Sequence, residues 1–162
     1  MDKDDFERRI LQMLPTLHSI AWSYYGSVHD SADAIQDAIL KAWAKRGSLR
    51  GAELFRPWVT RILINRCKTG LNRRARIEAI PTDPMPERTA PDGTSDTELY
   101  EAIRTLTLKE RVPLMMYHIE GYSTIEIARI LRLPKGTVTF RLMRARQRLK
   151  ILLGGYGDET QN

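Results

Sequence analysis

The stretch YSTIEIARILRLPKGTVTFRLMRARQRL, residues 122–149, contains the strongest structural signal in this chain. It predicts a short helix over residues 123–131, a turn at residues 132–133 and a long basic helix over residues 134–153. A short helix, a tight turn and a long basic helix form the layout of a helix-turn-helix, whose second helix enters the major groove of DNA.

The long helix is predicted to have one buried and one exposed face. At about 100° per residue, an apolar stripe faces the short helix, where it would pack on Ile127 and Leu131. This stripe consists of Val138, Leu142, Ala145 and Leu149. The opposite face consists of Phe140, Met143, Arg144 and Gln147, with Thr139 at its edge. An exposed Phe and Met among arginines gain nothing in water, which favours DNA contact over an ordinary solvated face. Arginine can read guanine, and an apolar side chain can contact the methyl group of thymine.

Basic charge is concentrated in two runs. Residues 56–76 and residues 132–150 each hold seven Lys or Arg and no acid, in a chain whose net charge of +6 predicts a polyanionic partner. In the second run, Arg141 and Arg148 flank the buried stripe and can reach phosphates. For Arg141, an ion pair with Glu126 is an equal alternative.

Residues 81–98 separate the two runs and differ from both. They hold five acids, one base and four prolines, and they lack apolar periodicity. Prolines favour extended conformations, so this segment is predicted to be a flexible linker between two small domains. At 162 residues the chain is long enough for two such domains, each of marginal size.

The N-terminal domain is predicted to contain three helices. Apolar residues recur with a helical period over residues 6–25, where Pro15 is expected to kink or divide the helix. A second helix is capped by Asp30 and stops at Gly47. A third begins near Leu54 and continues through most of the first basic run.

The C-terminal domain is predicted to contain four helices, and no segment predicts a strand. Residues 97–105 form the first helix. Thr107 with Glu110, and Ser123 with Glu126, have the spacing of capping boxes, which open the second and third helices. The long basic helix is the fourth. The predicted fold class is therefore all-α.

Composition excludes several functions. Cys67 is the only cysteine, so an internal disulfide is impossible, no metal site is expected, and its thiol is predicted to be buried and inert. His18, His29 and His118 lack metal-ligand spacing and are expected at surface or satisfied positions. No glycine-rich phosphate loop or catalytic motif is present, so neither a cofactor nor an enzymatic activity is predicted. An apolar span and a signal-peptide pattern are also absent, which predicts a cytoplasmic protein without membrane insertion.

Residues 122–149 closely resemble region 4 of the extracytoplasmic-function (ECF) sigma factors, most tightly at GTV, residues 136–138, and RLMRAR, residues 141–146. The N-terminal domain agrees independently. DAIQDAILKAW, residues 33–43, resembles the region 2 helix, and FRPWVTRILIN, residues 55–65, resembles the segment after it. The resemblance extends from about Phe6 to Leu153. It implies a dissociable subunit that gives RNA polymerase its choice of promoter.

This resemblance implies a division of the chain and a set of partners. Residues 1–78 would be the region 2 helical bundle, 79–97 the acidic linker, 98–155 the region 4 helix-turn-helix domain and 156–162 a disordered tail. The implied partners are core RNA polymerase, through its β′ clamp helices and its β flap, promoter DNA and an anti-sigma factor. The free chain would be a monomer.

Region 4 of the family binds the upstream (−35) promoter element as duplex DNA. The residues that the resemblance assigns to this contact are Lys135, Thr137, Thr139, Phe140, Arg141, Met143, Arg144 and Arg148. Relatives often carry Arg or Lys and then Ser where this chain has Thr139 and Phe140, so the preferred −35 sequence stays open.

Region 2 of the family binds the β′ clamp helices, here through Asp33, Gln36 and Asp37, which are neighbours on one helix face. The residues alone would favour a solvated face with acids near a helix start. The resemblance reverses that interpretation.

Region 2 also holds unpaired bases of the −10 element, which requires stacking surfaces, basic charge and hydrogen-bonding groups. The residues assigned to this role are Arg50, Trp58, Arg61, Asn65 and Lys68, with the loop of residues 47–53 receiving an extruded base. On the residues alone, Trp58 fits a core position almost as well, and Trp22 and Trp43 are expected in the core.

Two other functions are compatible with a helix-turn-helix. A free-standing regulator would bind operators as a dimer, but it would need a dimerisation surface or a ligand domain where this chain resembles a DNA-melting module. An interaction protein that sequesters other factors by mimicking a sigma domain would not need an intact basic recognition face. That face is present here.

Overall fold

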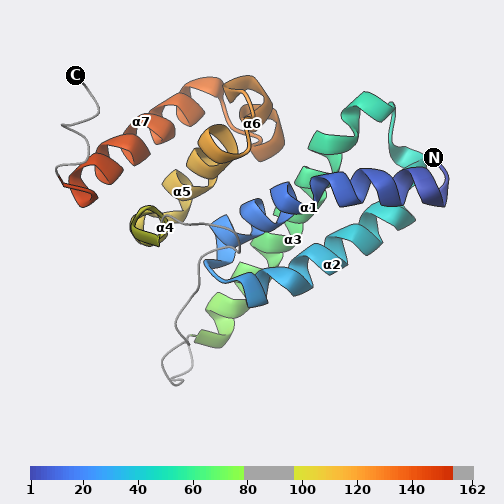
Figure 1. Ribbon diagram of the computed structural model, residues 1–162, viewed down its shortest axis with the longest axis horizontal. Coiled ribbons are helices and arrows are strands. Elements are labelled where there is room, and N and C mark those ends of the chain that lie inside the picture. The colour runs from blue at the N-terminus through green and yellow to red at the C-terminus, as the bar shows by residue number, and fades with distance from the viewer. Residues whose placement is uncertain (79–96, 155–162) are drawn as a thin grey trace. The chain divides into compact units, whose positions relative to one another are not determined.

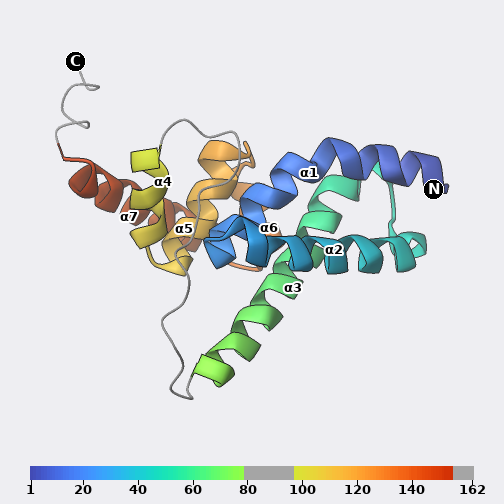
Figure 2. The same ribbon diagram turned by 60° about the horizontal axis from the view of Figure 1, so that its bottom comes forward.

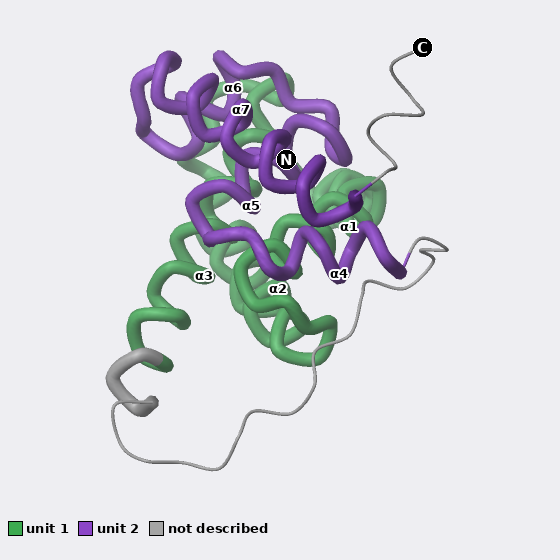
Figure 3. Tube along the Cα trace, turned by 90° about the vertical axis from the view of Figure 1, so that its left-hand side faces the viewer, with its two compact units in different colours: residues 1–91 green, residues 92–162 purple. Residues whose placement is uncertain are grey.

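The computed structural model describes residues 1–78 and 97–154, which are helical and contain no strand. The chain divides into two compact units, residues 1–91 and 92–162 (Figure 3). The all-α fold class is therefore confirmed. The predicted linker, residues 79–97, lies outside the described residues except for Thr97, and the predicted tail lies wholly outside them.

The first unit is built from α1 (Lys3–Tyr25), α2 (Val28–Ala44) and α3 (Phe55–Glu78). Each helix contacts the other two, and α3 runs obliquely across α1 and α2 (Figure 1, Figure 2). Two 3-10 turns, η1 (Arg46–Ser48) and η2 (Ala52–Leu54), connect α2 to α3. The fully buried side chains of this unit include Leu17, Ile20, Trp22, Val59, Leu63 and Ile64.

Pro15 does not divide α1, although the prediction allowed either a kink or a division. The helix continues through Pro15, because its two halves both bury apolar side chains in the bundle, which offsets the lost hydrogen bond. Two details of α2 differ from the predictions. Ser27 caps α2 by accepting a hydrogen bond from the Asp30 amide, so Asp30 is not the cap. The helix ends at Ala44, before Gly47, where the chain tightens into η1.

The tryptophans of this unit do not share one environment. Trp22 is fully buried, as predicted. Trp43 is only half-buried, because it lies near the end of α2.

The second unit consists of α4 (Thr97–Thr105), α5 (Leu108–Leu114), the π-helical turn η3 (Met115–Ile119), α6 (Thr124–Leu131) and α7 (Lys135–Leu152). Helix α7 contacts α4, α5 and α6. The fully buried side chains include Ile103, Met115, Met116, Tyr122, Ile127 and Leu142. The predicted helix-turn-helix is α6, its turn and α7.

One predicted capping box is present and one is not. Ser123 and Glu126 exchange the two reciprocal hydrogen bonds, each 3.1 Å long. Thr107 precedes α5, but its side chain makes no capping hydrogen bond. Glu110 is buried instead, with Oε2 3.4 Å from Nε of Arg148 on α7. Tertiary packing therefore draws this carboxylate away from the start of its own helix.

Gly70 allows Tyr25 to approach α3 closely. The Tyr25 hydroxyl donates a hydrogen bond to the Cys67 carbonyl over 3.5 Å. A Cβ atom on Gly70 would collide with that hydroxyl and would lie 2.8 Å from Nη1 of Arg66. A side chain at this position would therefore force the buried tyrosine ring to move.

Replacement of Gly70 by Ala tests this contact. In a helix interior the change normally stabilises by about 1 kcal/mol. Here we expect Gly70→Ala to lower the free energy of unfolding by about 1 kcal/mol, because it overpacks the contact with Tyr25. In a Tyr25→Phe background, which lacks the hydroxyl, the loss should disappear. Urea unfolding of the four proteins measures this, and an equal gain from Ala in both backgrounds would contradict it.

Candidate nucleic-acid and protein interfaces

Helix α7 has one buried and one exposed face, as its sequence predicts. Val138, Leu142 and Ala145 are buried and Leu149 is half-buried. On the opposite face Phe140 is 55% exposed and Met143 44% exposed, with Thr139, Arg144 and Gln147 exposed beside them. Exposed apolar side chains of this size among cations indicate a contact surface.

Some of the predicted DNA-contacting residues of α7 have partners within the helix. The Arg144 guanidinium lies 6.0 Å from the centre of the Phe140 ring. The Thr139 hydroxyl donates to the Lys135 carbonyl over 3.1 Å. Lys135 is exposed and Thr137 is half-buried at the start of the helix. Arg144 and Phe140 can therefore present one joined cationic and apolar surface to a base pair.

The two arginines that flank the buried stripe differ. Arg148 is half-exposed and pairs with Glu110, whose Oε2 atom makes no hydrogen bond within the described residues. Arg141 is half-buried, and among residues 97–154 no ion pair joins it to Glu126. Glu126 is held in the capping box instead, so the predicted alternative for Arg141 is wrong.

A cluster on the other side of α7 was not found from the sequence. Arg146 Nε donates to His118 Nε2 over 2.9 Å, and its guanidinium lies 5.5 Å from the centre of the Tyr117 ring. Burial lowers the pKa of His118, and the nearby Arg146 charge lowers it further. His118 thus has a hydrogen-bond partner, in line with the expected satisfied position, and the bond holds Arg146 against η3. An adjoining apolar hollow of about 250 Å³ is lined by Leu99, Ile103, Leu114, His118, Ile119, Arg146 and Leu149.

In the first unit, one side of α3 carries the predicted −10 residues. Trp58 and Arg61 are half-buried, whereas Asn65 and Lys68 are exposed. The Trp58 ring lies 6.2 Å from the Phe55 ring, so part of it belongs to the core. The predicted loop residue, Arg50, is exposed between η1 and η2.

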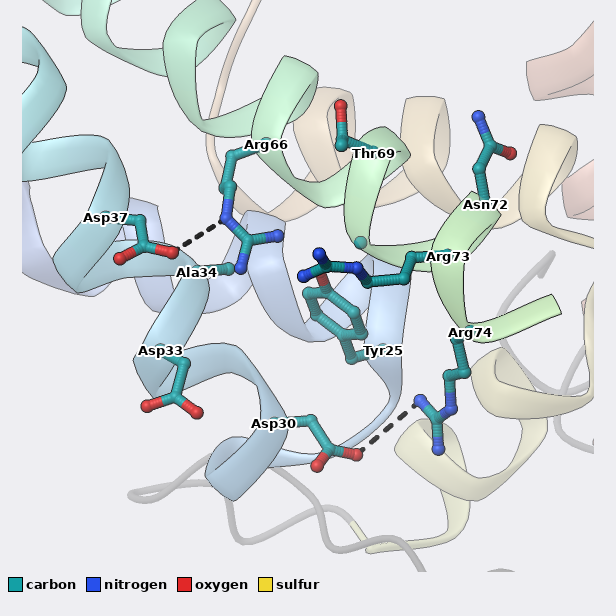
Figure 4. A pocket seen from close by; sticks show the side chains of 11 residues that line it. Tyr25, Asp30, Asp33, Ala34, Asp37, Arg66, Thr69, Asn72, Arg73 and Arg74 are labelled. Atoms are coloured by element: carbon teal, nitrogen blue, oxygen red, sulfur yellow. Dashed lines mark hydrogen bonds and ion pairs between the residues drawn. The ribbon is translucent and has the colours of Figure 1, made fainter. Parts of the chain in front are cut away.

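The acidic face of α2 pairs with α3. Asp33, Gln36 and Asp37 are exposed. Asp37 Oδ2 lies 2.8 Å from Nε of Arg66, and Asp30 Oδ2 lies 3.6 Å from Nη1 of Arg74 (Figure 4). Both pairs border a hollow of about 770 Å³ between the two helices, with Asp33 on its α2 side.

Two residues of the first basic run are therefore paired with acids of α2. Arg66 and Arg74 belong to the run that the sequence assigned to a polyanion. Acids on α2 and bases on α3 were the signal for this pairing, but the register between the helices is needed to match them.

The described residues contain neither a reactive thiol nor a group of side chains that could hold a metal ion. Cys67 is buried, and burial raises the pKa of its thiol to about 12, which keeps it protonated and unreactive. No group of three His, Cys, Asp or Glu that could hold a metal occurs in residues 1–78 and 97–154. None of the described helices has the length and apolar character that crossing a membrane requires.

Comparison with known proteins matches both units. The family model described as Sigma-70 region 2 matches residues 10–77, and the model described as Sigma-70, region 4 matches residues 96–149. The ECF RNA polymerase sigma factor SigM of Mycobacterium tuberculosis is 33% identical over 158 residues, which cover 94% of this chain and 79% of the relative. The RNA polymerase sigma-H factor of Pseudomonas aeruginosa is 26% identical, covering 90% and 84% respectively.

The fold also matches a solved structure. The sigma factor RpoE of Bartonella quintana, crystallised in complex with the anti-sigma factor NepR, superposes with a TM-score of 0.79 at 28% identity, covering 92% of this chain and 96% of that one. In this chain the region 2 match precedes the region 4 match. The chain belongs to the ECF RNA polymerase sigma factors.

Proposed function

We propose that this sigma factor binds core RNA polymerase and directs initiation at promoters by recognising their −10 and −35 elements. Residues 1–78 would provide polymerase binding and −10 recognition, and residues 98–155 would provide −35 recognition. The observation that carries the proposal is the two-faced helix α7, which buries Val138, Leu142 and Ala145 and exposes Phe140 and Met143 among arginines.

Recognition of the −35 element would use the exposed face of α7 in the major groove. Arg144 would read a guanine edge, and Phe140 or Met143 would contact a thymine methyl group. Arg141 and Arg148 would bind phosphates, which position the helix without reading sequence. The Arg148 contact would compete with its pairing to Glu110.

Recognition of the −10 element would use unpaired bases. Trp58 offers a half-buried stacking surface, and Asn65 and Lys68 add an exposed amide and an exposed cation along the same side of α3. Stacking on an aromatic ring stabilises each base by about 1–3 kcal/mol, which is comparable to the cost of unstacking it from the duplex.

Polymerase binding would use Asp33, Gln36 and Asp37 on the β′ clamp helices, with the second unit reaching the β flap. Exposed carboxylates of this kind favour a basic partner. The complex of RpoE of Bartonella quintana with NepR supports an anti-sigma factor as a further partner. We take the free chain to be a monomer that acts in the cytoplasm, where it meets the polymerase.

Charge reversal on α2 separates polymerase docking from the internal ion pair. Asp37→Lys would place two cations together, because Asp37 pairs with Arg66. The swap Asp37→Lys with Arg66→Asp restores the pair with opposite polarity. We expect the swap to recover stability, since an exposed ion pair is worth about 0–1 kcal/mol. Affinity for core polymerase should stay at least about tenfold reduced, because the lysine repels a basic partner.

Asp33→Lys is the matched variant for this test, because no ion pair of Asp33 is present in residues 1–78. It should weaken polymerase binding with no change in thermal stability. Binding of the fluorescently labelled chain to purified core polymerase measures the affinity of each variant, and thermal unfolding measures its stability. Recovery of wild-type affinity by the swap would show that Asp37 acts only through Arg66.

Replacement of Arg144 and replacement of Arg148 should change DNA binding in different ways. Arg144→Ala should relax base preference at one −35 position by about 1–3 kcal/mol. Arg148→Ala should weaken binding to all promoters alike, and it also leaves the buried Glu110 carboxylate without its cation. The double variant Arg148→Ala with Glu110→Gln removes that charge and isolates the phosphate contact.

Gel shifts on a set of promoters with single −35 substitutions, with and without core polymerase, measure these effects. If Arg144→Ala leaves the base preference unchanged, Arg144 does not read a base of the −35 element. Tight, sequence-specific binding without polymerase would contradict the proposed function and favour a free-standing regulator.

A further inference from the structure

The loop between α2 and α3 is held at each end by an arginine over an aromatic ring. At its start, the Arg46 guanidinium lies 3.6 Å from the centre of the Trp43 ring, and its Nη1 donates to the Trp43 carbonyl over 2.8 Å. At its end, the Arg9 guanidinium from α1 lies 5.8 Å from the centre of the Phe55 ring, and its Nη1 donates to the Ala52 carbonyl over 3.4 Å.

One buried residue of α1 connects the two ends. The Phe6 ring lies 5.2 Å from the Trp43 ring and 5.8 Å from the Phe55 ring, edge to face in both contacts. Phe6 and Phe55 are both buried. Both ends of the loop therefore rest on one aromatic cluster, which packing holds in place.

The middle of the loop is extended. Leu49 has φ −70° and ψ 123°, and Gly51 has φ −172° and ψ 148°, with the exposed Arg50 between them. η1 and η2 close on either side through hydrogen bonds from Leu49 to Arg46 and from Leu54 to Gly51. The shape of this middle segment depends on how its two ends are fixed.

Arg9 is itself oriented by an acid one turn earlier on α1. Its Nε donates to Asp5 Oδ1 over 3.1 Å, and the side chain is 28% exposed. Arg8 binds the same carboxylate but is 61% exposed, and in residues 1–78 no hydrogen bond joins Arg8 to the loop. The two neighbouring arginines therefore share one partner and differ in their contact with the loop.

We propose that Arg9 is a positioning residue for −10 recognition, which ties α1 to the end of the loop and holds its extended middle in the shape that receives an unpaired base. The inference rests on the proposed role of this loop in −10 recognition. A site that is already in its bound shape loses less conformational entropy when the base enters. Arg9 would act on the base through the loop backbone at Ala52 and not by direct contact.

The test compares Arg9→Gln with Arg8→Gln in the full chain. Hydrogen exchange of the free protein, followed by mass spectrometry over residues 45–54, reads the loop directly. Arg9→Gln should speed exchange there about three- to tenfold, as expected from the loss of one hydrogen bond and one cation–π contact. Arg8→Gln should leave it unchanged.

The functional measurement uses holoenzyme and a promoter library randomised over the −10 and −35 elements. Arg9→Gln should reduce base preference at one −10 position about three- to tenfold and leave −35 preference unchanged. Arg9→Lys keeps the positive charge beside Asp5 but lacks the planar guanidinium group with its several donors. It should therefore recover part of the −10 base preference. It also serves as the test variant if Arg9→Gln fails to fold.

Equal loss of transcription across the whole library, with −10 preference intact, would overturn the proposal and leave Arg9 a purely structural role. An Arg8→Gln variant with the same effects would also overturn it. Failure of the wild-type holoenzyme to select any promoter would contradict the proposed function instead. In that case, the hydrogen-exchange measurement alone would test whether Arg9 holds the loop in its extended shape.

Discussion

Burial on one side of a helix fixes its rotation, and the rotation decides which residues the other side presents. In α7, Val138, Leu142 and Ala145 are buried on one side. Phe140 and Arg144 lie on the opposite side and are therefore exposed to solvent. The same constraint acts in α3, where burial of Val59 and Leu63 turns Asn65 and Lys68 outward. The proposed contact surfaces of both units thus depend on ordinary core packing, so core substitutions that rotate either helix would alter the proposed recognition without replacing any proposed contact residue.

The basic residues divide into those that reach outward and those that hold other side chains. Arg66 and Arg74 pair with acids of α2, Arg146 donates to His118, and Arg9 spans from Asp5 to the loop. Exposed ion pairs contribute little to stability, because water competes for both charges. Their effect here is orientation, since each pair fixes a long side chain in one position. The net charge therefore overstates the number of Lys and Arg side chains that can bind phosphate without first leaving a partner within the chain.

Helical periodicity was enough to predict the helices and the face of α7, because those depend on short-range spacing and on burial. Local rules failed where a distant partner competed for the same side chain. Glu110 has the spacing of a capping box, yet its carboxylate pairs with Arg148. Asp30 has the residue type of a cap, yet its carboxylate pairs with Arg74 on α3, and Ser27 caps the helix instead. The contacts of Arg9 and Arg66 could not be predicted, because they depend on the register between helices that no sequence spacing encodes.

We propose that these two exposed faces work only as parts of one polymerase. Transcription start sites can be mapped in vitro with purified core polymerase and fragmented genomic DNA, in the presence and absence of the chain. We expect discrete start sites that appear only with the chain, each following upstream −10 and −35 elements at one fixed spacing. Start sites that are the same with and without the chain would contradict it.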